Sequence, residues 1–336
     1  TASQQPSTVM ALAVAQTDSS AVFSMTANVP TSQFNRAPFQ ELNMHHQADF
    51  NSVIKPVVKR SFQPSRVEML PLAMRQAAAT MTTGRPGPVN LDIPYNLFQE
   101  EAEVTREPTG SAFGRRRSGA DPEDIAKVVA RLLAAERPVI FIGHGGTLSE
   151  ASAELTALAQ GMGIPVISSP NGMGCMDMTD DLSLGFIGRN GAYQANQAGR
   201  HADLVLALGA RFDDRSASSW KPGYSWNFPV TKLVHVDLDH GELGRNYTPD
   251  LPILADARAF LRQLLAAVEA RGALKPRYAG WLGEIAGWRG EWETFLAPNW
   301  DQHATPISPF RIVEDCQRVL PEDTILSLDS GVHHNW

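Results

Sequence analysis

Two hydrophobic patterns alternate along the first part of the chain. Residues 8–16 are rich in alanine, methionine and leucine, which favours a helix, and residues 21–26 form a short apolar run typical of a buried strand. A second unit follows, with a strand at residues 57–62, a helix at 67–81 and a strand at 89–93. This alternation predicts an α/β fold built on a mostly parallel sheet.

The alternation begins again near residue 121 and is more regular from there. Asp121 suits the N-cap of a helix, and Pro122 suits its first position. The pattern predicts further helices and strands, which we expect at residues 121–136, 138–142, 149–161, 164–168, 204–208, 233–236, 253–254 and 257–270. Such a run predicts a complete doubly wound, Rossmann-like domain.

Other stretches do not follow this alternation. Residues 99–120 mix charged, glycine and proline residues without an apolar period, so we expect a solvated linker. Its arginine run at 115–117 is interpreted as surface charge, with a phosphate site as the alternative. Residues 276–300 predict a polar helix whose tryptophans share one face and pack on the protein's own surface. A helix at 310–320 and a strand at 324–329 end the chain.

Composition and charge exclude several classes of protein. The 336 residues predict about two domains, and 29 basic against 36 acidic side chains argue against nucleic-acid binding. No run approaches about 18 apolar residues and no signal peptide is recognisable, so no membrane segment is predicted. Cys175 and Cys316 lie far apart, which excludes a zinc site and favours a reducing, cytoplasmic compartment. The chain starts without methionine, and we expect it to be a piece of a longer protein.

Glycine-containing loops after several predicted strands carry the first functional signal. Ligands bind at the carboxyl edge of a parallel sheet, where glycine lets the backbone approach a phosphate closely. The candidate residues at these strand ends are Gly143, Gly145, Gly188, Arg189, Gly191, Gly209, Arg211 and Asp237. Taken singly, each loop is more simply a capped strand-to-helix turn, but together they favour a nucleotide site. No G-x-G-x-x-G opens a strand–helix unit, which argues against a nicotinamide dehydrogenase.

Several longer motifs resemble a known enzyme family. Residues 84–94 (GRPGPVNLDIP) resemble the string that closes the pyrimidine-binding domain of thiamine-diphosphate enzymes. Residues 29–32 (VPTS) with 38–41 (PFQE) are similar to the V-P-T-S…A-F-Q-E of acetohydroxyacid (acetolactate) synthase large subunits. Residues 209–215 match that family's G-A-R-F-D-D-R, and residues 235–239 are close to its H-x-D-I-D. On these motifs the chain is identified as a member of the thiamine-diphosphate superfamily, in the synthase-like branch.

The resemblance implies how the chain divides into domains. The implied parts are the C-terminal half of a pyrimidine-binding domain (1–98), a linker (99–120), a whole central nucleotide-binding domain (121–272), a linker helix (273–305) and the start of a pyrophosphate-binding domain (306–336). The family's activating glutamate and its G-D-G…N magnesium motif are expected outside this segment, so it should be inactive alone. The family's site forms between two chains, which implies a homodimer or homotetramer.

The resemblance also implies an activity and its residues. The family uses thiamine diphosphate with Mg²⁺ to form or cleave C–C bonds of a 2-oxo acid, and in this branch decarboxylation is followed by carboligation. Phe39 and Gln40 would lie near the reacting carbon, and Lys59 would line the substrate entrance. Gly331 and His333 would contact the cofactor diphosphate. A decarboxylase, a C–C hydrolase and a non-catalytic nucleotide-binding subunit stay open, and Lys59 is equally well explained as a solvated strand-end lysine.

The central domain raises the question of a flavin. In the synthase branch this domain holds FAD, whereas some relatives hold ADP or nothing. The glycine loops named above occupy matching positions, and Asp256 matches as well. The resemblance implies that Arg211 pairs with a phosphate or ribose and that Asp237 accepts hydrogen bonds from adenosine hydroxyls.

Overall fold

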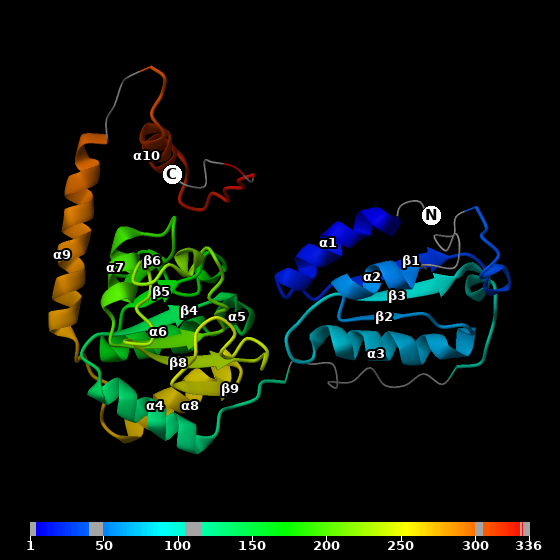
Figure 1. The fold of residues 1–336 in the computed structure, drawn as a ribbon, viewed down its shortest axis with the longest axis horizontal. Coiled ribbons are helices and arrows are strands. Elements are labelled where there is room, and N and C mark those ends of the chain that lie inside the picture. Colours follow the sequence, from blue (N-terminus) through cyan, green and yellow to red (C-terminus); the bar gives the residue numbers. More distant parts are fainter. Residues whose placement is uncertain (1–4, 40–49, 105–115, 300–304, 330, 332–336) are drawn as a thin grey trace. The chain divides into compact units, whose positions relative to one another are not determined.

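The computed structural model describes residues 5–39, 50–104, 116–299, 305–329 and 331. The chain divides after Arg116 into two compact units, which are described separately below (Figure 1). All strands in both sheets pair in parallel. This confirms the predicted α/β class and the parallel sheets.

The first unit is built on a three-stranded sheet with the order β1-β3-β2. Its strands are β1 (Phe23–Asn28), β2 (Arg60–Phe62) and β3 (Val89–Pro94). Its helices are α1 (Gln5–Thr17), α2 (Phe50–Ile54) and α3 (Leu70–Thr82), and its 3-10 turns are η2 (Thr31–Gln33), η4 (Lys55–Val57), η5 (Val67–Met69) and η6 (Tyr95–Phe98). Figure 1 shows α3 on one face of this sheet and α1 with α2 on the other.

The central strand β3 is buried along its whole length. Val89, Leu91 and Ile93 share a cluster with Ala77 of α3 and Phe62 of β2. Side chains alternate along a strand, so the residues between these apolar ones, Asn90 and Asp92, are directed to the opposite face.

The second unit contains a six-stranded sheet with the order β6-β5-β4-β7-β8-β9. Its strands are β4 (Pro138–Ile142), β5 (Val166–Ser168), β6 (Ser183–Phe186), β7 (Leu204–Leu208), β8 (Lys232–Asp237) and β9 (Leu251–Leu254). Counted from β4 the order is 3-2-1-4-5-6, which is that of a doubly wound dinucleotide-binding domain. The order reverses between β4 and β7, so a ligand crevice is expected at their carboxyl ends.

Helices cover this sheet on both faces. They are α4 (Pro122–Ala134), α5 (His144–Leu148), α6 (Ser152–Met162), α7 (Tyr193–His201), α8 (Ala257–Ala270) and α9 (Ala279–Leu296), with the 3-10 turns η8 (Pro170–Gly172), η9 (Ser218–Trp220) and η10 (Ala297–Asn299). The last helix, α10 (Pro309–Val319), has no buried residue. Helices α4 and α6 both contact α8, whereas α7 contacts α9. In Figure 1, α7 and α9 lie across the sheet from α4 and α8.

Local sequence signals account for several helix ends. The Asp121 side chain accepts a hydrogen bond from Glu123 N at 2.8 Å and begins α4 as predicted. Gly163 ends α6 with a left-handed φ of 73°, which glycine adopts without strain. The tryptophan face of α9 packs inward as predicted, since Trp281 is buried and Trp288 packs on the core.

Three predictions are wrong in detail. Residues 144–148 form the short helix α5 and not an open glycine loop, and residues 183–186 add the strand β6. Residues 324–329 form no strand, and Ile325 in this segment is 96% exposed. A strand needs neighbours for its backbone hydrogen bonds, and this segment pairs with none of the strands in the described residues.

The predicted linker also needs a correction at its C-terminal end. Arg117 belongs to the second unit and makes an ion pair there, while residues 105–115 lie outside the described part of the chain. Ala120 exchanges backbone hydrogen bonds with the Gln263 side chain of α8 at 2.8 and 3.1 Å. The solvated segment therefore ends before Arg117, which is not simply surface charge.

Candidate functional site

Three of the predicted glycines meet at the point where the strand order reverses. A Cβ on Gly143 would overlap the carbonyl oxygen of Gly209, and a Cβ on Gly145 would lie 2.7 Å from the Cα of Gly209. Gly209 also has a left-handed φ of 57°. Glycine is therefore needed here so that the loops after β4 and β7 can touch through their backbones.

The amide groups of these glycines are not available to a phosphate. Gly143 N donates to Leu208 O at 2.9 Å, Gly145 N to Gly209 O at 3.0 Å, and Gly209 N to Val236 O at 2.8 Å. The expected phosphate cradle of N–H groups is therefore not formed by these residues. Gly143, Gly145 and Gly209 instead form a surface without side chains, the glycine floor, where the strand order predicts a ligand crevice.

A second group of predicted residues follows β6. A Cβ on Gly188, whose φ is 124°, would overlap the carbonyl oxygen of Arg215, and Arg189 N donates to that same oxygen at 3.2 Å. Gly191 N donates to Gly188 O at 2.9 Å. The Arg189 guanidinium pairs with Asp214 at 3.0 Å, with both side chains about half exposed. The loops after β6 and β7 are thus joined at the same carboxyl edge of the sheet.

Arg211 and Asp237 lie at this edge as well. Asp237 is half-buried at the end of β8, where its Oδ1 accepts a hydrogen bond from Asp239 N at 2.8 Å. Arg211 is half-buried two residues after Gly209, and its guanidinium has no ion pair among the described residues. This edge of the sheet therefore carries the guanidinium groups of Arg189 and Arg211 and the carboxylates of Asp214 and Asp237.

Asp256 is engaged within the protein itself. It is 2% exposed and caps α8 through hydrogen bonds from Arg258 N and Ala259 N, both at 3.1 Å. Arg117 Nε lies 3.5 Å from its Oδ1. The geometry of Asp256 is that of a structural carboxylate at the start of α8.

Two buried polar atoms near this edge have no hydrogen-bond partner in the described part of the chain. One is the hydroxyl of Ser168, the last residue of β5, and the other is Nδ1 of His235 in β8. Ser168 is 6% exposed. A buried hydroxyl without a partner is costly in a folded protein, and a bound ligand is one way to satisfy it.

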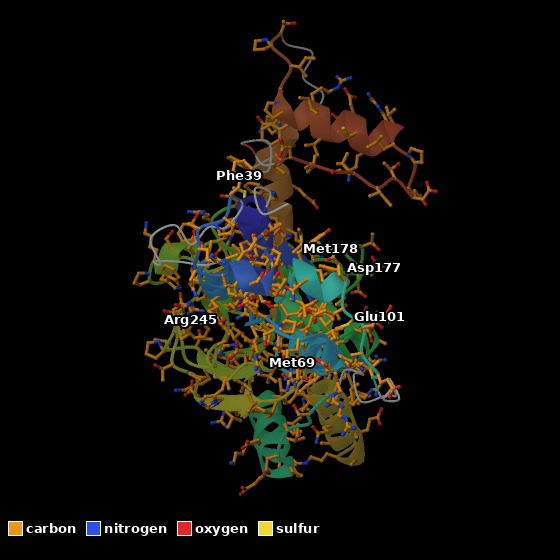
Figure 2. The ribbon with its side chains drawn as sticks, turned by 90° about the vertical axis from the view of Figure 1, so that its right-hand side faces the viewer. Phe39, Met69, Glu101, Asp177, Met178 and Arg245 are labelled. Atoms are coloured by element: carbon orange, nitrogen blue, oxygen red, sulfur yellow. The ribbon has the colours of Figure 1, made fainter. Side chains whose placement is uncertain are left out.

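The predicted catalytic residues lie in the first unit. Lys59 Nζ donates to the carbonyl oxygens of Thr83 at 2.7 Å and Arg85 at 2.8 Å, so its ammonium clamps the turn before β3. Phe39, which is labelled in Figure 2, is fully exposed. Gln40 lies outside the described residues.

The two residues predicted to contact the cofactor diphosphate lie near the C-terminus. Gly331 is exposed, and His333 falls outside the part of the chain that the structure describes.

Sequence reasoning missed a buried polar network in the first unit. Asp92 is fully buried, and its carboxylate accepts hydrogen bonds from Thr26 at 2.9 Å, Asn28 at 2.6 Å and Gln63 at 2.8 Å. The Asn28 side chain in turn accepts from Val29 N at 2.8 Å. The network thus fixes the start of the segment that leads to Phe39. The alternation of Asn90 and Asp92 with apolar residues in β3 was the signal that could have revealed it.

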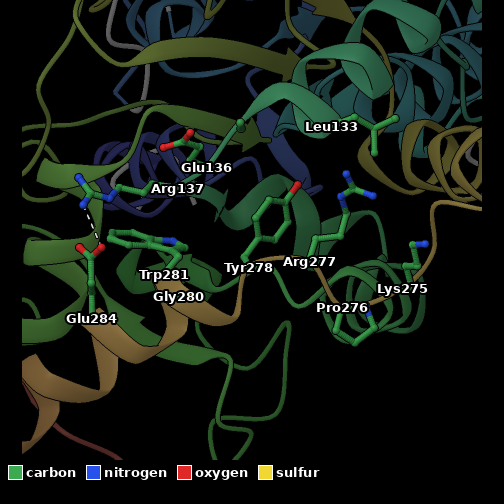
Figure 3. Close-up of a pocket in the computed structure, with 11 residues that line it drawn as sticks. Leu133, Glu136, Arg137, Lys275, Pro276, Arg277, Tyr278, Gly280, Trp281 and Glu284 are labelled. Carbon is green, nitrogen blue, oxygen red and sulfur yellow. Dashed lines mark hydrogen bonds and ion pairs between the residues drawn. The ribbon is translucent and has the colours of Figure 1, made fainter.

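A cleft of about 540 Å³ lies at the opposite edge of the second unit's sheet. Figure 3 shows Trp281 and Tyr278 in its wall, beside the ion pair of Arg137 with Glu284 at 2.9 Å. Tyr278 and Trp281 are anchored through hydrogen bonds to backbone carbonyls, at 2.6 and 3.1 Å. Arg137 directly precedes β4, whereas Gly143 directly follows it, so the cleft is separate from the glycine floor.

Within the described ranges, no three His, Cys, Asp or Glu side chains are placed to hold a metal ion. None of the described helices is long and apolar enough to cross a membrane.

Comparison with known proteins identifies the family. Residues 125–264 match the model for the central domain of thiamine pyrophosphate enzymes. The probable acetolactate synthase large subunit of Methanocaldococcus jannaschii is 34% identical over 338 residues, which cover 98% of this chain and 54% of that protein. The large subunit of acetolactate synthase isozyme 1 of Escherichia coli is 31% identical, with 98% of this chain and 54% of that protein covered.

The Escherichia coli isozyme 3 large subunit is 28% identical, with 97% and 55% covered. The chain thus spans about half the length of the curated relatives it matches. The matched range of residues 125–264 contains the glycine floor and all six strands of the second unit's sheet. Residues 125–264 therefore belong to the family of thiamine pyrophosphate enzyme central domains, and the chain is similar to acetolactate synthase large subunits along almost its whole length.

Proposed function

We propose that this chain is part of a thiamine-diphosphate-dependent enzyme that decarboxylates a 2-oxo acid and joins the remaining fragment to an acceptor. The supporting observation is the 34% identity, along 98% of the chain, to a protein described as a probable acetolactate synthase large subunit. Thiamine diphosphate, held with Mg²⁺, supplies the carbanion chemistry when bound. Phe39 and Gln40 are proposed to orient the substrate, and Gly331 and His333 to contact the diphosphate.

The proposed role of Lys59 depends on its position in the turn before β3. Its ammonium holds the carbonyls of Thr83 and Arg85, so it is suited to shape the substrate entrance. A carboxylate could also be attracted to this positive charge. A decarboxylase or a C–C hydrolase would use the same residues, and the nature of the product distinguishes these activities.

In the second unit we propose a site for FAD or ADP at the carboxyl edge of the sheet. Three features favour it: the glycine floor at the point of order reversal, the guanidinium groups of Arg189 and Arg211, and the unpartnered hydroxyl of Ser168. The arginines would pair with phosphates, since the exposed Arg189–Asp214 pair is weak and open to exchange. Asp237 would accept hydrogen bonds from ribose hydroxyls.

The assembly and location follow from the same proposal. A homodimer or homotetramer in the cytoplasm is proposed, and both cysteines are free thiols in the structure, as a reducing compartment requires. The second candidate function is a non-catalytic nucleotide-binding subunit. It is favoured by the completeness of the second unit's sheet compared with the three strands of the first.

The test uses two measurements. The visible spectrum and calorimetric titration with FAD and ADP should show binding to the 336-residue chain. The whole protein, expressed from its natural gene, should release carbon dioxide from pyruvate only with thiamine diphosphate present. Nucleotide binding without any thiamine-dependent turnover of 2-oxo acids would overturn the enzyme assignment in favour of the binding subunit.

A further inference from the structure

Side chains hold three successive carbonyl groups directly after Gly209. His235 Nε2 lies 2.8 Å from Ala210 O. Asn246 Nδ2 donates to Arg211 O at 3.0 Å and to Phe212 O at 3.1 Å. Trp220 Nε1 donates to Phe212 O at 3.0 Å as well. The path of the loop after β7 is thus set by donors from β8, from the segment after β8 and from η9.

The same loop contains a strained residue. Phe212 has a left-handed φ of 52°, which is rare for a bulky side chain and persists only where the surroundings enforce it. Phe212 is 2% exposed, and its ring lies within an aromatic cluster. The rings around it, with centroids 5.1 to 5.8 Å away, are those of Phe141, Trp226, Phe228, His235 and Tyr247. Strain of this kind is typical of functional loops.

The strained loop leads directly to the crevice floor. A Cβ on Gly209 would lie 2.6 Å from the Cα of Gly145, so the two loops have no free space between them. A shift of residues 210–212 that reaches Gly209 would therefore press it against Gly145. We propose that His235 and Asn246 are positioning residues of the nucleotide site, which hold the loop after β7 so that the glycine floor keeps its shape and Arg211 stays at its edge. This inference rests on the proposed nucleotide site.

The geometry also sets the protonation state of His235. Its Nε2 faces a carbonyl oxygen and must carry the proton, so the buried Nδ1 is the unprotonated nitrogen. Burial lowers the pKa of His235, while the Ala210 carbonyl and the Glu242 carboxylate raise it by smaller amounts. Glu242 is itself paired with Arg245 at 3.2 Å, and the Phe212 ring meets the imidazole edge-on. Protonation would leave an Nδ1–H group buried without an acceptor.

The experiment measures ADP affinity of the full 336-residue chain by calorimetry. His235→Leu and Asn246→Ala should each weaken ADP binding by about tenfold, since buried carbonyls lose their donors. His235→Gln keeps a donor for Ala210 O and should restore most of the affinity at pH 7.5. His201→Leu is the matched control, because His201 stacks on Trp288 at the α7–α9 contact, away from the loop after β7.

The pH profile separates positioning from simple stabilisation. Wild-type affinity should fall once the pH passes below the lowered pKa of His235, which lies under the ordinary imidazole value of 6.5, whereas the affinity of His235→Gln should stay level. If His235→Leu and Asn246→Ala only lower the melting temperature and leave ADP affinity unchanged, the positioning role is wrong. If the wild-type chain itself binds neither ADP nor FAD, the nucleotide site fails instead, and the two failures are distinguishable.

Discussion

Arg117 Nε lies 3.5 Å from Oδ1 of Asp256, which is 2% exposed. The same guanidinium donates to Ser149 O at 3.0 Å and to Glu150 at 2.8 Å. It therefore holds together the beginning of the second unit, the end of α5 and the N-terminus of α8. The sequence suggests that Arg117 is surface charge, and the family resemblance connects Asp256 with the cofactor. In the structure these two residues are paired with each other.

Removing this arginine should destabilise the second unit. Arg117→Met leaves the buried carboxylate of Asp256 without its cation, and we expect a loss of about 1–3 kcal/mol in unfolding free energy, since Arg117 is partly exposed. All seven tryptophans lie in the second unit, so urea unfolding followed by tryptophan fluorescence reports on it alone. Lys127→Met removes an exposed ion pair of α4 and should leave the midpoint nearly unchanged. Equal shifts in both variants would contradict the assigned role of Arg117.

Gly209→Ala should be much more harmful than a similar change elsewhere. The added methyl group meets Gly145 Cα at 2.6 Å at a left-handed backbone position, so we expect a loss of about 2–5 kcal/mol. Gly272→Ala is the matched control, since Gly272 has a φ of 60° but no heavy atom within 4 Å of the added methyl group. Its loss should be about 1–2 kcal/mol. Fluorescence-detected urea unfolding measures both, and a Gly209→Ala loss no greater than that of Gly272→Ala would refute the crowding argument.

Lys59→Met should loosen the turn before β3. Methionine has no ammonium group, so the carbonyl oxygens of Thr83 and Arg85 lose the donor that Lys59 provides. The free energy of local opening at this turn should therefore fall by about 1 kcal/mol. Hydrogen–deuterium exchange of the amides in residues 83–89 would show this as faster exchange. Lys55→Met changes an exposed lysine of the same unit and should leave those amides unaffected. Unchanged exchange in Lys59→Met would show that the clamp does not stabilise the turn.

Acid should weaken the contact between α6 and α8 through Glu154. Burial alone would raise the pKa of Glu154, but hydrogen bonds from Arg258 and Arg262, at 2.9 and 2.7 Å, outweigh it and the net pKa is lowered. A lowered carboxyl pKa stabilises the fold above the unfolded value of 4.5, and this stabilisation is lost as the pH falls through the lower folded value. Urea unfolding between pH 6 and pH 3 should therefore show a smaller loss for Glu154→Gln than for the wild type. Parallel pH profiles would disprove the contribution.

Much of the second unit follows from the sequence because its strands are buried on both faces. The apolar runs of β4 and β7 coincide with the predicted strands, since parallel strands between two helix layers are apolar throughout. Strand β6 was missed because its four residues include Gly185 and only Leu184 among them is fully buried. In such a short edge strand, pairing with β5 outweighs a weak local preference.

The sequence by itself determined the fold class, the family and the positions where the backbone needs glycine, because these depend on local patterns and motifs. Only the tertiary structure decided that Gly143 and Gly209 are needed for the close contact between their two loops. It also showed that their amide groups donate to backbone carbonyls and are not available to a phosphate. It also decided that Arg117 pairs with Asp256, and that His235 supports Ala210. These contacts join segments far apart in the chain, and no local pattern specifies which buried carboxylate or carbonyl will face which donor.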